Sequence, residues 1–332
     1  MTPNENLGER KIIEIIQSRL DVMPKMPIPF GDDVSAYDIG DNMLAVLKTD
    51  MLVDRTDVPY GMSLWQASRK AVVMNISDFA AKGVKPIVAL VSLGLPKTLT
   101  EKGIEEIGKG LNAGAREYDA YIIGGDTNEA SDLVISISLF GIAEKGKIML
   151  RSGAKPGDLV AVTGFFGRTA SGLKILHNGF KMQSKIRKSL TDSVLMPQAR
   201  LKEGLALATT EVVTAAIDSS DGLAWSLHEI AKASNIGFNI NQLPTAEEVK
   251  EFAEANKLDP TELALYGGEE YELVITIKPK LWKKAENAVK KVGGKLLQIG
   301  KVTADKQIIL EIDGKRQTIE ARGWEHFQSS KF

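Results

Sequence analysis

The chain has 332 residues, of which 43% are hydrophobic and 26% are charged, so it is long enough for two soluble domains of ordinary size. A formal net charge of −1 and scattered Lys and Arg residues give no electrostatic reason to expect binding to nucleic acid or to an anionic membrane. Because Cys is absent, disulfides, thiolate metal sites and cysteine nucleophiles are excluded.

Two features bear on the location of the protein. The sequence has no apolar run of the roughly 18 residues that a membrane helix needs. Its start, from Met1 to Arg10, is polar and lacks the apolar core of a signal peptide. We therefore expect a cytoplasmic protein without membrane contact.

Helical and extended patterns alternate over the first 150 residues. Apolar spacing predicts helices over 12–20, 64–82 and 104–118, the last opened by a capping box of Thr98 and Glu101. Strands are expected over 43–48, 87–95, 120–123 and 133–143. Strands before, between and after two helices predict an α+β unit with helices on one face of a sheet.

A turn-rich segment from Arg151 to Asp158 then separates a second unit. We place the domain boundary there, with an N-terminal domain over 1–150 and a C-terminal α/β domain over 151–332. Its strands are expected over 159–163, 271–277, 296–302 and 307–312, and its helices near 168–177, 198–209, 222–234 and 280–292.

Six short clusters pair carboxylates with Gly, Ser or Thr. Small residues let the backbone approach a ligand, and carboxylates supply the hard oxygens that Mg²⁺ prefers. Each cluster alone is also compatible with a turn or a helix cap. Their recurrence in both halves predicts one polyanionic substrate held through several divalent cations. The clusters are Gly31-Asp32-Asp33, Thr49-Asp50, Ser77-Asp78, Gly124-Gly125-Asp126-Thr127, Asp218-Ser219-Ser220-Asp221-Gly222 and Gly267-Gly268-Glu269-Glu270.

The acidic clusters favour phosphoryl transfer over other chemistry. A carboxylate repels a phosphate oxygen, so cations must lie between them, and such cations hold donor and acceptor in line. A phosphate acceptor requires no special nucleophile. The three histidines, His177, His228 and His326, are isolated in the sequence, and we interpret them as surface or capping residues.

Two nucleotide-binding motifs are rejected. Gly103 to Lys109 fits the start of a Walker A pattern, but Gly110 replaces the required Ser or Thr and the segment lies inside a predicted helix. No G-x-G-x-x-G fingerprint follows the first strand, which argues against a nicotinamide enzyme.

The ordered motifs resemble the thiamine-monophosphate kinases, within the superfamily of aminoimidazole-ribonucleotide synthetases. Thr49 to Val53 together with Gly267 to Leu273 favour the kinase over its relatives. Hydrogenase-maturation and selenophosphate-forming relatives use cysteine chemistry, for which this chain has no residue. The matching segments are Gly31–Val34, Thr49–Val53, Asn75–Gly83, Gly124–Thr127, Arg151–Ala154, Ile217–Leu223 and Gly267–Leu273.

The resemblance implies a two-domain, synthetase-like α+β fold and ATP-dependent phosphorylation of thiamine monophosphate to thiamine diphosphate with several Mg²⁺ ions. It also implies a homodimer in which the N-terminal sheets join. One alternative is an ATP-dependent synthetase of the same superfamily acting on another phosphorylated metabolite. A second is a nucleotide- or metal-binding regulatory dimer without catalysis.

The resemblance also assigns site residues. The implied metal ligands are Asp33, Thr49, Asp50, Asp78, Asp126, Asp218 and Asp221, of which Asp50, Asp126 and Asp221 would be central to catalysis. The implied ATP contacts are Gly125, Asp126, Arg151 and Ser220. The implied substrate contacts are Asp57, Glu269 and Trp324. Arg151 suits phosphate through its bidentate fork, and the Trp324 indole suits a cationic thiazolium.

Two positions depart from the common pattern. Asp57 stands where many bacterial members have a His that meets the substrate, a difference that we interpret as an archaeal-type trait. Glu270 stands where the familiar motif has Asp, which keeps the charge but lengthens the side chain.

Overall fold

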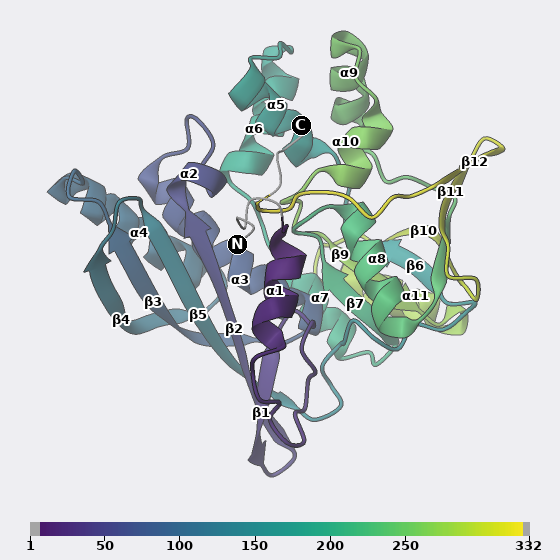
Figure 1. The fold of residues 1–332 in the computed structure, drawn as a ribbon. Coiled ribbons are helices and arrows are strands. Elements are labelled where there is room, and N and C mark those ends of the chain that lie inside the picture. The colour runs from purple at the N-terminus through teal and green to yellow at the C-terminus, as the bar shows by residue number, and fades with distance from the viewer. Residues whose placement is uncertain (1–6, 328–332) are drawn as a thin grey trace.

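The computed structural model describes residues 7–327, so the polar start discussed above lies partly outside it. Two β-sheets are built from separate stretches of chain, one over 35–144 and the other over 159–318. In Figure 1 they stand on either side of α1 (Glu9–Gln17), which runs between them in purple. This arrangement confirms the predicted two-domain α+β architecture, while the boundary at 150/151 stays a prediction.

The N-terminal sheet has five strands in the order β1-β2-β5-β3-β4, and only β3 and β4 are parallel. Helices α3 (Leu64–Lys82) and α4 (Glu101–Glu117) cover one of its faces. The strands are β1 (Ser35–Gly40), β2 (Met43–Val53), β3 (Pro86–Leu95), β4 (Tyr121–Glu129) and β5 (Val134–Glu144). The open face exposes large apolar side chains, among them Leu47, Met51, Leu90, Tyr121 and Ile123.

Helix α3 lies at the centre of the molecule. It begins with a capping box of Ser63 and Gln66 and ends at Gly83, which adopts the left-handed conformation with φ 65°. It packs on β2 and β5 on one side and on α7 (Leu201–Ala208) and β7 (Val213–Asp218) on the other. Its charged residues are therefore enclosed between the two sheets rather than turned to solvent.

The C-terminal sheet has seven strands in the order β12-β11-β8-β10-β6-β9-β7, and β8 with β11 is its one parallel pair. Its remaining strands are β6 (Leu159–Val162), β8 (Gly237–Ile240), β9 (Leu273–Ile277), β10 (Leu297–Thr303), β11 (Ile308–Ile312) and β12 (Lys315–Thr318). The helices that accompany it, besides α7, are α5 (Arg168–Asn178), α6 (Ser184–Leu195), α8 (Leu223–Ser234), α9 (Glu247–Asn256), α10 (Pro260–Tyr266) and α11 (Trp282–Lys291).

Three local predictions are wrong. Thr49 and Asp50 do not end a strand, because β2 continues to Val53 with Asp50 opposite Ile137 of β5. The segment 124–127 likewise lies inside β4 and not after it. In both cases the ladder pairs the backbone of a polar segment that resembles a loop in sequence. Helix α4 is capped by Thr100, whose hydroxyl accepts from the Gly103 N–H, and not by Thr98.

Several short elements were not predicted. The four-residue helix α2 (Asp54–Asp57) follows β2 directly, and α6, α9 and α10 form a cluster at one end of the C-terminal sheet (Figure 1). Among residues 7–327, no helix combines the length and the apolar character needed to cross a membrane.

Candidate functional site

Three buried aspartates meet where the two sheets face α3. Asp33 comes from the turn before β1, Asp78 from α3 and Asp218 from the end of β7. One oxygen from each lies within 4.8 Å of the others. Ser77 donates to Asp218 Oδ2 at 2.6 Å. Residues from both halves of the chain thus form one acidic centre.

The three carboxylates differ in their electrostatic balance. Burial raises the pKa of Asp218 to about 6, and the nearby Asp33 adds to the rise. Burial also holds the pKa of Asp78 well above its usual range, although Lys48 opposes this. At Asp33, burial would raise the pKa, but Lys82 and Arg151 outweigh burial and lower it. The Asp33 side is therefore compensated by fixed cations, and the side formed by Asp78 and Asp218 is not.

Lys82 and Arg151 hold the compensated side. The fully buried Lys82 ammonium lies 2.6 Å from Asp32 Oδ1 and 2.7 Å from Asp33 Oδ2, and it donates to the Ala216 carbonyl at 2.9 Å. Arg151 donates from Nε to Asp33 Oδ1 at 2.6 Å and from its backbone N–H to Asp32 Oδ2 at 3.0 Å. Sequence reasoning missed Lys82; its one signal is a Lys within the otherwise apolar Phe-Ala-Ala-Lys-Gly end of a buried helix.

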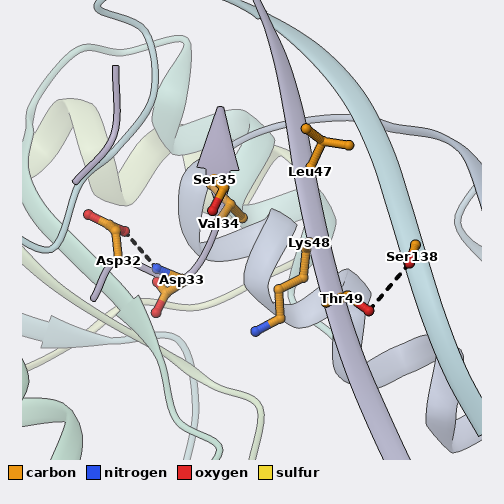
Figure 2. Close-up of a pocket in the computed structure, with 8 residues that line it drawn as sticks. All are labelled: Asp32, Asp33, Val34, Ser35, Leu47, Lys48, Thr49 and Ser138. Atoms are coloured by element: carbon orange, nitrogen blue, oxygen red, sulfur yellow. Dashed lines mark hydrogen bonds between the residues drawn. The ribbon is translucent and has the colours of Figure 1, made fainter. Parts of the chain in front are cut away.

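A cavity of about 420 Å³ opens beside this centre (Figure 2). Lys48 and Thr49, neighbours on β2, point to opposite sides of the strand. Lys48 reaches the acidic centre, with Nζ 3.0 Å from Asp78 Oδ2 and 3.7 Å from Asp50 Oδ2. Thr49 instead lies 3.3 Å from Ser138 across the sheet. The lining residues are Asp32, Asp33, Val34, Ser35, Leu47, Lys48, Thr49 and Ser138.

The acidic centre fits a divalent cation. Its donors are carboxylate oxygens, which suit Mg²⁺, and three of them already converge within the distance that one ion or two adjacent ions can bridge. Asp50 borders the same centre through Lys48. The described part of the chain thus brings together four of the seven predicted metal ligands.

Asp126 and Thr49 lie on the opposite face of the N-terminal sheet. Asp126 lies opposite Ser92, which in turn lies opposite Ser136. This pairing puts the Asp126 side chain on the open face of the sheet together with Thr49, whereas Asp50 faces the helices. Strand β4 is three places from β2, a separation of about 14 Å. Within one chain, Asp126 is therefore remote from the acidic centre. Packing alone requires Gly at position 125, because a Cβ there would lie 1.8 Å from the Val91 carbonyl oxygen.

Asp221 lies on the turn between β7 and α8, next to Ser220, whose hydroxyl donates to it at 3.2 Å. Arg10 of α1 approaches from the other side, with Nη2 3.2 Å from Asp221 Oδ2. The Arg10 guanidinium also stacks 3.5 Å above the Trp225 ring. The predicted ligand Asp221 thus pairs with an arginine in this structure and stands apart from the three converging aspartates.

The predicted substrate contacts form a second group. Lys70, buried on α3, donates to the Asp57 carbonyl at 2.8 Å and pairs with the Glu269 carboxylate. His326 Nε2 lies 3.9 Å from Asp57 Oδ1, and its ring is 5.8 Å from that of Trp324. The structure therefore brings Asp57, Glu269 and Trp324 together, and it adds Lys70 and His326, which sequence reasoning missed. The His326 side chain is 35% exposed, so it lies at the surface as predicted, but in space it is close to Asp57.

Glu270 does not join that group. Its carboxylate accepts from the backbone N–H groups of Gly167 at 2.6 Å and Thr169 at 3.1 Å, at the start of α5. Burial raises the pKa of Glu270 to about 7. The longer side chain at this position thus caps a helix, while the neighbouring Glu269 reaches Lys70.

Comparison with known proteins matches nearly the whole chain. The profile of the AIR synthase related protein N-terminal domain matches residues 31–143, and that of the C-terminal domain matches residues 155–313. The thiamine-monophosphate kinase of Nitrosopumilus maritimus is 38% identical over 97% of this chain and 99% of its own. That of Pyrococcus horikoshii is 39% identical over 91% of this chain and 92% of its own.

Solved structures give the same likeness. A structure described as AaThiL complexed with AMPPCP and TMP superposes with a TM-score of 0.85 and 28% identity, covering 98% of this chain and 99% of that one. Hydrogenase maturation protein HypE superposes with a TM-score of 0.66 at 19% identity, which indicates a shared fold alone.

Proposed function

The chain belongs to the family of thiamine-monophosphate kinases, and we propose that its acidic centre carries out the family's reaction. The enzyme phosphorylates thiamine monophosphate to thiamine diphosphate with ATP as co-substrate. The observation that carries the proposal is the convergence of Asp33, Asp78 and Asp218 beside a cavity of about 420 Å³. The AaThiL complex supports it, since that protein holds AMPPCP, an ATP analogue, together with TMP.

We assign Mg²⁺ to this centre, where Asp33, Asp50, Asp78 and Asp218 would hold it. Bound Mg²⁺ neutralises phosphate charge and keeps donor and acceptor in line. The protein's own contribution is to fix these carboxylates on β2, α3, β7 and the turn before β1, so that little reorganisation is needed. The pKa values of Asp78 and Asp218, both raised, support a site that gains stability when it acquires positive charge.

We propose that separate groups of residues contact the nucleotide and the thiamine phosphate. Arg151 and Ser220, with Gly125 and Asp126, would contact ATP. Asp57, Glu269 and Trp324 would contact thiamine phosphate, which fits their assembly around Lys70 and His326. Arg151 must exchange its contact with Asp33 for a phosphate oxygen to fill this role.

A homodimer would place Asp126 in this scheme. The open face of the N-terminal sheet carries exposed Leu47, Met51 and Leu90, an apolar surface of the kind that a partner subunit covers. Asp126 and Thr49 lie on that face. We propose that two such sheets join, so that Asp126 contributes to a site shared with the partner subunit. We also propose that the enzyme works in the cytoplasm.

The direct test is product analysis. Purified protein is incubated with ATP, excess Mg²⁺ and thiamine monophosphate, and ADP and thiamine diphosphate are quantified by chromatography. Equal amounts of both products, lost on chelation of Mg²⁺, are expected. ADP formed only with a different phosphorylated acceptor would refute the substrate and identify a synthetase of the same fold. ATP binding without any consumption would refute catalysis.

A further inference from the structure

Lys48 stands among predicted metal ligands without a role of its own. It precedes Thr49 and Asp50 on β2, and its side chain lies on the helix-facing side of the sheet with Asp50. Its ammonium is 3.0 Å from Asp78 Oδ2 and 3.7 Å from Asp50 Oδ2. A cation thus already lies between two carboxylates that we assign to Mg²⁺.

Lys82 shows what a purely structural lysine looks like in the same centre. Its side chain is 0% exposed, and its ammonium donates to the Ala216 carbonyl and lies 2.6 Å from Asp32 Oδ1 and 2.7 Å from Asp33 Oδ2. An ammonium has three donors and no more, so Lys82 has none left for a ligand. Lys82 is enclosed by protein and does not line the cavity.

Lys48 differs on each of these points. Its side chain is 19% exposed and lines the cavity of about 420 Å³ (Figure 2). Its two carboxylate neighbours account for at most two of its three protons, and the Asp50 contact is long for a hydrogen bond. At least one donor therefore remains for an acceptor inside the cavity, and the four-carbon stem can swing.

The charges around Lys48 also favour movement. Two carboxylates, those of Asp78 and Asp50, face its ammonium and hold the side chain as a cation. A divalent ion at Asp50 and Asp78 would repel this ammonium and compete for the same oxygens. A polyphosphate in the cavity offers the nearest new acceptors, and lysine is a common point-charge ligand of phosphate.

We propose that Lys48 is a phosphate-binding residue of this site: it rests between Asp78 and Asp50 in the metal-free protein and contacts a phosphate oxygen of the nucleotide once divalent cations occupy those carboxylates. This inference rests on the proposed function, because it takes the nucleotide as the occupant of the cavity. It predicts two opposite effects of removing the ammonium, one on Mg²⁺ and one on the nucleotide.

The test uses Lys48→Met, Lys48→Arg and a matched control, Lys145→Met, which removes a lysine in the turn after β5 that pairs with exposed Asp38. Binding of AMPPCP at saturating Mg²⁺, and of Mg²⁺ alone, is measured by calorimetry on the full chain. Lys48→Met should weaken AMPPCP binding at least tenfold and tighten Mg²⁺ binding. Lys48→Arg should retain most of the AMPPCP affinity, and Lys145→Met should match the wild type in both.

AMPPCP affinity of Lys48→Met within twofold of the wild type would overturn the proposal, and so would weaker Mg²⁺ binding, which indicates a merely structural lysine. If Lys48→Met does not fold, Lys48→Gln is measured against the same criteria. Wild-type protein that binds AMPPCP but phosphorylates no thiamine monophosphate would overturn the proposed function and leave the Lys48 result readable. Wild-type protein that does not bind AMPPCP would overturn both.

Discussion

The two sides of the acidic centre are built differently. Around Asp32 and Asp33, Lys82 and Arg151 supply two fixed cations at hydrogen-bond distance, and the pKa of Asp33 is lowered. Around Asp78 and Asp218, the described polar partners are Lys48, whose side chain is 19% exposed, and the Ser77 hydroxyl, and both pKa values are raised. In the metal-free protein the first side is neutralised by cations of the protein, whereas the second keeps excess negative charge that a metal can relieve.

The largest expected effect is a loss of turnover when a carboxylate on the side of Asp78 and Asp218 is removed. Asp78→Asn keeps the shape of the side chain but removes a predicted Mg²⁺ ligand, so turnover should fall by about a thousandfold or more, an interaction loss of about 4 kcal/mol in the transition state. The metal-free variant should be as stable as the wild type or more so, because one of several crowded carboxylates is gone. Steady-state kinetics and denaturant unfolding measure the two quantities. Retained turnover would contradict the assignment.

The compensated side should respond in the opposite way. Lys82→Met leaves Asp32 and Asp33 buried with one cation fewer, and breaking a buried ion pair typically costs about 3–5 kcal/mol. The free energy of unfolding of the metal-free protein, from urea denaturation, should fall by that amount. Lys48→Met removes a side chain that is only partly buried, so it should lower the free energy of unfolding clearly less. Equal losses in the two variants would remove the distinction between the two sides.

The pH dependence of stability sharpens the comparison further. The pKa of Asp218 is about 6 in the folded state against 3.8 for the free side chain. As the pH rises, the unfolded chain therefore loses this proton at a lower pH than the folded protein. Stability from this group is therefore fully present below about pH 4 and is lost as the pH rises through 6. Between pH 4.5 and 7 the metal-free wild type should lose about 2 kcal/mol more than Asp218→Asn. Identical pH slopes would show that Asp218 ionises normally, and added Mg²⁺ should reduce the difference.

The smallest effect is expected at Glu270, outside the acidic centre. Glu270→Gln keeps an oxygen that can accept from the Gly167 and Thr169 N–H groups, so the cap of α5 survives. The KM for thiamine monophosphate should stay within about twofold of the wild type. Glu269→Gln, which weakens the contact with Lys70, should raise that KM clearly more. A large KM change in Glu270→Gln would place this side chain at the substrate after all.

The sequence indicated which residues belong to the site better than it indicated where they lie in space. Acidic residues next to Gly, Ser and Thr identified Asp33, Asp78 and Asp218, because small neighbours and carboxylates in both halves leave a local pattern. The sheet face on which a residue lies depends on pairing across strands, so the separation of Asp126 from Asp50 had no local signal.

The lysines that reach the site had even less signal in the sequence. Lys48, Lys70 and Lys82 lie in segments that read as ordinary strand and helix, and only the packing of α3 between two sheets turns them inward. His326 was likewise unpredictable, because its neighbour Asp57 is far away in sequence. The family resemblance, by contrast, extends over nearly the whole chain, and it predicted the two-domain fold that the structure has.

We infer that the acidic centre, and not another part of the molecule, holds the divalent cations used in phosphoryl transfer. The most direct test is a crystal of the full chain grown with Mn²⁺ and AMPPCP, in which anomalous scattering locates the metal. Anomalous peaks are expected between Asp33, Asp78 and Asp218, next to the phosphates. Phosphates bound without metal at these three carboxylates, or Mn²⁺ confined to other residues, would contradict it.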